Sequence, residues 1–200
     1  ELETYAVATV AWQTWRDANP DGLVLSRDTG IDRAYGQNPY AGYDDVNGPP
    51  FLYEGEVDGR NTAMTRVVGV EWGEEALAVP LASLREIGVI ESGLAGDELV
   101  VLWAAGTASS LDAFEIAAGA AVGATGVFVP VVEGRRLTLS AVDGGTGDTF
   151  VDAETGSTWN VLGQATDGPL AGAQLEAIPH VDTFWFAWSA FRPDSAVIES

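Results

Sequence analysis

Short apolar runs separated by glycine and proline dominate the pattern of this chain of 200 residues. In two places, residues 67–79 and 127–141, a pair of such runs flanks a turn that contains glycine. This arrangement is typical of β-hairpins. Residues 99–103 form a continuous apolar run of strand length, which favours a central strand of a sheet. We therefore predict two hairpins and a central strand.

Residues 81–87 and 111–118 are the helix candidates between these strands. The stretch 30–50 is rich in Gly, Pro, Asn, Asp and Tyr and has no periodicity. We predict a long ordered loop there, because its tyrosines give it material to pack. With 24 Gly and 9 Pro between short strands, the chain is expected to be α+β and mainly β, with antiparallel strands and a few peripheral helices.

An internal repeat links the two ends of the chain at an offset of 173 positions, with five identities in thirteen positions. The matching residues are Trp12, Trp15, Pro20, Asp21 and Val24, which correspond to Trp185, Trp188, Pro193, Asp194 and Val197. Each copy predicts a short helix preceded by a capping Thr (Thr9 or Thr183), with both tryptophans on one face, then a Pro-Asp turn and a strand. We expect one domain over 1–200: a repeat-like unit and loop over 1–50, and a β-rich core over 66–200.

The net charge of the chain limits which partners it can bind. There are 30 acidic residues and 9 arginines, with no Lys and no Cys, for a net charge of −21. This charge excludes binding to nucleic acid and to anionic membrane surfaces. The acids are spread along the chain, which favours solvation of the fold in concentrated salt. The composition is that of extreme halophiles such as haloarchaea, or of a GC-rich moderate halophile. Without Cys, no disulfide, thiolate nucleophile or Cys zinc site can form.

One acidic cluster has the ligand type that Ca²⁺ prefers, namely carboxylate oxygens between glycines. It comprises Asp143, Asp148, Asp152 and Glu154, with Thr155 and Ser157 nearby. The spacing is not that of an EF-hand loop, and residues 152–159 are explained more simply as a strand, a turn and a returning strand. Apart from this candidate Ca²⁺ site, the residues identify no cofactor.

Hydrolytic chemistry is a second possibility. A Ser-His-Asp arrangement would need His180, the single histidine, with Ser109, Ser110 or Ser157 as nucleophile and Asp112 or Asp182 as the orienting group. Paired carboxylates of the glycosidase kind need only two acids in a cleft. The candidate catalytic residues are therefore His180, Asp112, Asp152 and Glu154, and a structural role remains open for each of them.

The candidate binding residues are aromatic or basic. Arg33, Tyr35, Tyr40 and Tyr43 lie together in the predicted loop, and a Gly-Pro loop that carries Tyr and Arg is typical of recognition surfaces. The alternative is that the rings pin the loop to the body. Trp159 is a further candidate, as a platform on which a sugar could stack.

Several ordered motifs resemble the family named domain of unknown function 3179, and the resemblance covers nearly the whole chain. They are Trp12-x-x-Trp15, Asn19-Pro20-Asp21, Tyr35-Gly36-Gln37-Asn38-Pro39-Tyr40-x-x-Tyr43, Ala78-Val79-Pro80-Leu81, Gly106-Thr107-Ala108, Asp152-x-Glu154-Thr155-Gly156-Ser157-x-Trp159, Gly168-Pro169-Leu170-Ala171-Gly172 and Phe184-Trp185-Phe186-Ala187-Trp188. The resemblance implies an exported or surface-anchored protein and no known activity.

Many relatives in that family carry Cys-Pro-Leu-Cys just before the Gly-Thr-Ala motif, whereas Leu102 and Ala105 occupy the two Cys positions here. Any thiol or soft-metal chemistry of that segment is expected to be lost. The resemblance also implies that the first Trp unit is the tail of a preceding copy of the module, so an upstream part of a precursor is a candidate partner.

We therefore expect an extracellular or cell-surface module, non-catalytic, that binds a partner not specified by the sequence, whether protein or small molecule. The alternatives are a hydrolase and a Ca²⁺-stabilised structural domain.

Overall fold

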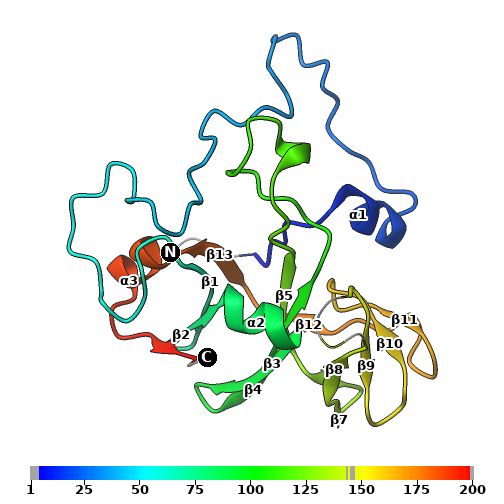
Figure 1. The fold of residues 1–200 in the computed structure, drawn as a ribbon. Helices are drawn as coiled ribbons and strands as arrows, with labels where there is room; N and C mark the ends of the chain where they lie inside the picture. The colour runs from blue at the N-terminus through cyan, green and yellow to red at the C-terminus, as the bar shows by residue number, and fades with distance from the viewer. Residues whose placement is uncertain (1–4, 143, 145–146, 199–200) are drawn as a thin grey trace.

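Figure 1 shows the arrangement of strands and helices in a computed structural model that describes residues 5–142, 144 and 147–198. The described residues form three four-stranded sheets and one two-stranded hairpin. The first sheet has the order β13 (His180–Phe184), β1 (Arg66–Trp72), β2 (Glu75–Pro80), β14 (Ala196–Val197). The second has the order β12 (Glu176–Ala177), β5 (Ala124–Val129), β4 (Asp97–Ala104), β3 (Val89–Leu94). The third has the order β11 (Ala165–Asp167), β10 (Thr158–Trp159), β9 (Phe150–Asp152), β8 (Leu139–Ala141).

The first predicted hairpin is confirmed, because β1 and β2 pair antiparallel across the Gly73 turn. The second is smaller than predicted. Only β6 (Val131–Val132) and β7 (Arg135–Arg136) pair across the Glu133-Gly134 turn. The flanking runs belong to β5 and β8 in two different sheets. Pro130, which has no backbone N–H to donate, separates β5 from β6.

The central strand predicted at 99–103 is confirmed as β4, which pairs with β3 on one side and β5 on the other. Alternate side chains of a strand point to opposite faces of its sheet. Val100 and Leu102 pack in the core cluster shared with the third sheet, while Val101 and Trp103 pack in the cluster shared with the first. The run is apolar throughout because both of its faces are buried.

The helix predicted at 81–87 is confirmed as α2 (Leu81–Ile87). It starts after Pro80, and it ends at Gly88, which is left-handed with φ of 75° and donates its N–H to the Leu84 carbonyl at 2.7 Å. The prediction of a helix over 111–118 is wrong. Only the short 3₁₀ helix η1 (Ile116–Ala118) forms there, because residues 111–116 use their backbone carbonyls to hold another segment.

The two Trp helices are α1 (Trp12–Ala18) and α3 (Trp185–Phe191). The expected Thr caps are absent: the N-cap residues are Ala11 and Phe184, and neither helix has a side-chain cap. The strand expected after each Pro-Asp turn forms only in the second copy, as β14. The described part of the chain contains no helix with the length and apolar character needed to cross a membrane. Overall, the α+β, mainly β class is confirmed.

Candidate functional site

The loop that carries the tyrosines is docked along residues 111–116. Asn38 is only 2% exposed. Its backbone N–H donates to the Phe114 carbonyl at 2.7 Å, and its side-chain amide donates to the Ala113 carbonyl at 3.3 Å. Farther along the loop, the Tyr43 N–H donates to the carbonyl of Leu111 at 3.0 Å. These bonds satisfy the backbone of both segments, so neither needs a helix or a strand.

The docked loop places Asp44 in an ion pair with Arg66. Arg66, the first residue of β1, places its Nη2 2.9 Å from Asp44 Oδ2, and the two side chains are 23% and 10% exposed. The buried Ser109 donates its hydroxyl to the same carboxylate. It also accepts from Arg66 Nη2 at 3.0 Å and from the Leu111 N–H at 3.1 Å. Three residues from distant segments thus share hydrogen bonds in one network, which restrains the loop.

Aromatic rings support the same network from the other side. The Arg66 guanidinium lies 5.1 Å from the centroid of the Phe184 ring, a distance at which a cation is attracted to the face of a ring. Tyr43 packs its edge against Phe184 at 5.6 Å and against Phe51 at 6.5 Å between centroids. Tyr43 therefore anchors the loop, as the packing alternative predicted.

Beside the ion pair is a groove of about 740 Å³, with walls from residues 42–46, 64–66 and 120–122 and from α2. Arg85, in the last turn of α2, lines it and lies 5.8 Å from the Trp103 ring. Among the described residues, no carboxylate forms an ion pair with Arg85. Asp45 and Asp112 line the groove too, and Asp112 accepts the Ala120 N–H at 2.6 Å. The groove is thus lined by both positive and negative groups.

The candidate catalytic residues are not brought together. Asp112 is in the groove, whereas His180 lines a different hollow of about 330 Å³ with Trp72 and Trp188. The His180 Nδ1 is 3.0 Å from the Ile178 carbonyl oxygen, and the hydrogen bonds of Asp182 run from Thr125. No Ser-His-Asp arrangement therefore forms within the described part of the chain.

Asp152 holds the turn between β9 and β10. It is 1% exposed and accepts from Trp159 Nε1 at 2.9 Å, from the Thr155 N–H at 2.6 Å and from the Thr155 hydroxyl at 2.9 Å. Burial raises the pKa of Asp152, but these bonds and one from the Ser157 backbone outweigh it and lower the pKa below its ordinary value of 3.8. Trp159 is fully buried, so it is a core residue and not an exposed platform for a sugar.

The expected Ca²⁺ ligands have separate partners. Glu154 accepts the Thr138 N–H at 2.7 Å and its hydroxyl at 2.9 Å, and the backbone bond is the main reason that the pKa of Glu154 is lowered. Asp148 accepts from Thr149, and Asp143 lies outside the described residues. Within the residues that the structure describes, no group of three or more His, Asp or Glu side chains is arranged to hold a metal ion.

Of the predicted binding residues, Tyr35 and Tyr40 are exposed, at 44% and 57%, and Arg33 is exposed as well. Sequence reasoning missed Arg66 and Arg85 as parts of a site, and it did not connect Asp44 with either of them. The signal that the sequence did offer was the scarcity of arginine. Because the chain has only nine, an arginine that lies in a hollow is a candidate for a specific role. Because the three residues are far apart in the sequence, no local pattern indicates that they line the same groove.

The fold and the groove define a mainly β domain in which distant loops converge on one charged hollow. The chain belongs to the family described as protein of unknown function (DUF3179), whose model matches residues 1–195. Comparison with curated proteins and with solved structures found no similar protein.

Proposed function

We propose that this chain is a non-catalytic binding module and that the groove beside the Arg66–Asp44 pair is its ligand site. The observation that carries the proposal is convergence: three of the family-like motifs meet at this groove. The loop that carries the tyrosine motif supplies Gly42, a position between its last two tyrosines, and the motif at 78–81 supplies Leu81. The Gly-Thr-Ala motif holds the third wall, because the Thr107 carbonyl accepts the Val122 N–H at 2.9 Å.

The chemistry of the groove favours a small zwitterionic ligand. Arg85 offers a guanidinium without an ion-pair partner in the described part of the chain, and such a group suits a carboxylate. Asp45 and Asp112 lie on the walls of the same groove and suit an ammonium group. A ligand that carries both charges satisfies both walls, whereas a simple anion would meet the two carboxylates.

Binding is favoured over hydrolysis by the state of Ser109. A serine nucleophile needs a base that accepts its proton and later returns it. The Ser109 hydroxyl donates instead to a carboxylate that is already paired with Arg66. The single histidine lines another hollow. Under this proposal Asp112 orients the Ala120 backbone and the bound ligand.

The test is to titrate a panel of free α-amino acids, with matched carboxylic acids and amines as single-charge analogues, in molar KCl. Calorimetry measures binding to the wild type and to each variant, and the chemical shift of the Arg85 Nε–H in the wild type locates the ligand in the groove. We expect a zwitterion to shift this signal at lower concentration than either analogue, and Arg85→Gln to abolish binding with unchanged melting temperature. Arg16→Gln, on the surface of α1, is the matched control. Binding that persists in Arg85→Gln, or no shift with any zwitterion, would contradict the proposal.

We further propose that the module works outside the cytoplasm and in concentrated salt. Salt adaptation is supported by the net charge of −21 with no Lys, and the location outside the cytoplasm is supported by the family resemblance alone. Repulsion between the acids destabilises the fold in dilute buffer, and it is screened as the Debye length shrinks to about 3 Å at 1 M salt. The melting temperature should therefore rise strongly between dilute buffer and molar KCl, with NaCl acting alike. A melting temperature that does not change in either salt would contradict salt adaptation. If added Ca²⁺ at low ionic strength raised the melting temperature by the same amount, the Ca²⁺ alternative would be supported instead.

A further inference from the structure

The two Trp units have the same local structure. The C-cap residue of α1, Asn19, has φ/ψ of −134°/68°, and that of α3, Arg192, has −133°/65°. Each donates its backbone N–H to the carbonyl of the second tryptophan of its helix. The turn that follows closes in the same way, from Gly22 to Asn19 at 2.9 Å and from Ser195 to Arg192 at 3.1 Å. The repeat in the sequence is thus a repeat in conformation.

The second unit is seated on the β1–β2 hairpin. Trp185 and Trp188 are 0% and 5% exposed. Trp188 packs directly on Gly69 of β1, where an added Cβ would lie 2.3 Å from the ring. Trp185 donates its Nε1–H to the Asp58 carbonyl at 2.8 Å. The glycine is required because a side chain would occupy the space that the indole fills.

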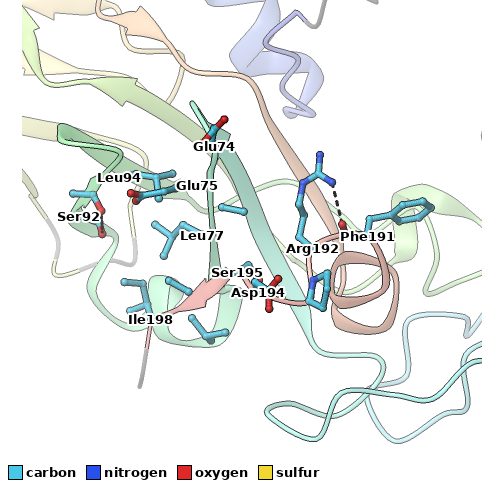
Figure 2. Close-up of a pocket in the computed structure, with 15 residues that line it drawn as sticks. Glu74, Glu75, Leu77, Ser92, Leu94, Phe191, Arg192, Asp194, Ser195 and Ile198 are labelled. Atoms are coloured by element: carbon cyan, nitrogen blue, oxygen red, sulfur yellow. Dashed lines mark hydrogen bonds between the residues drawn. The ribbon is translucent and has the colours of Figure 1, made fainter. Parts of the chain in front are cut away.

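The turn and strand of this unit extend the same sheet. β14 pairs parallel with β2, with Val197 opposite Ala78, and the Ile198 N–H donates to the Ala78 carbonyl at 3.0 Å. Figure 2 shows Ser195 and Ile198 beside Leu77 of β2, along a groove of about 560 Å³. The unit therefore closes the hairpin in two ways, with aromatic rings over its face and a strand along its edge.

The first unit has the same parts but no such seat. Trp12 is 56% exposed, and its ring stacks on Trp15 at 5.2 Å between centroids. The segment that corresponds to β14 and Ile198 is largely exposed: Leu23 is 95%, Val24 61% and Leu25 98% exposed. Three consecutive exposed apolar residues in the same short unit as an exposed Trp are typical of an interaction surface.

We propose that residues 12–25 pack on the face of a β-hairpin in a related module and pair with its edge, as residues 185–198 do with the β1–β2 hairpin of this chain. The partner surface is an antiparallel hairpin with a glycine under the second indole and an open edge that accepts a parallel strand. Arg16 stands at the position of Ser189, which is buried in the second unit. The partner hairpin is therefore homologous to β1–β2 but not identical, and it is not that of a second copy of this chain, whose seat is already filled by its own α3.

The first test exchanges the units within the full chain. Residues 185–198 are replaced by the sequence of residues 12–25, once completely and once with Ser189 retained. The control is the second graft with both tryptophans changed to Ala. We expect the graft with Ser189 to unfold in one transition within about 10 °C of the parent, the complete graft to melt lower because of the buried arginine, and the control to lose the cooperative transition. If the graft with Ser189 is no more stable than its control, the proposal is wrong.

The second test asks whether residues 12–25 bind to another copy of this chain. Sedimentation of the unmodified protein in molar KCl is expected to show a monomer over a roughly hundredfold range of concentration. A dimer that grows with concentration and is lost in Trp12→Ala would identify a second copy as the partner and would overturn the assignment to a related module.

Discussion

Asp152 and Asp44 are both shielded carboxylates that hold a loop in place, but they are held in opposite ways. The side-chain partners of Asp152 are neutral donors within seven residues along the chain. The partners of Asp44 are Arg66 and Ser109, 22 and 65 positions away. The first network is a turn that local sequence can build by itself. The second exists only after three distant segments have folded against one another.

The largest loss of stability is expected when the local network around Asp152 is broken. Asp152→Ala leaves the indole N–H of the buried Trp159 without an acceptor, together with the groups of Thr155 that bonded the carboxylate. An unsatisfied buried group and the lost charged hydrogen bonds together cost about 3 kcal/mol. Chemical denaturation in molar KCl measures this loss. Glu154→Ala, next to it but exposed, is the control and should cost clearly less.

A smaller effect is expected when the distant network is broken. Arg66→Ala removes the partner of Asp44, and because both side chains keep some exposure to solvent, the cost is below that of a fully buried pair, about 2 kcal/mol. The double variant Asp44→Asn/Arg66→Ala should recover part of this loss. A double-mutant cycle with coupling near zero would show that the pair does not hold the loop.

The smallest effect is a difference in acid stability. The pKa of Asp152 in the folded protein is lowered from 3.8. The stability that it contributes is therefore fully present above that value, and it is lost as the pH falls through the folded value. Wild-type protein should lose melting temperature in acid more steeply than Asp152→Asn. Parallel curves for the two proteins below pH 4 would contradict the assignment.

The comparison also explains what the sequence could and could not predict about the site. The turn at Thr155 to Ser157 was predicted, because small and polar residues with glycine favour turns wherever they occur. The helix predicted at 111–118 does not form, because the backbone there binds the loop at Asn38. Asp44 and Arg66 carry no local signal, so their meeting could not be predicted.

The sequence by itself determined the helix and the turn of each Trp unit and the two-sided burial of β4. These follow from interactions over a few residues and from the alternation of a strand. Only the tertiary structure decided that one pair of tryptophans is buried and the other exposed, and that Arg85 lies in a groove with Asp112. Burial depends on which surface a unit meets, and that surface is built by residues far away in the chain.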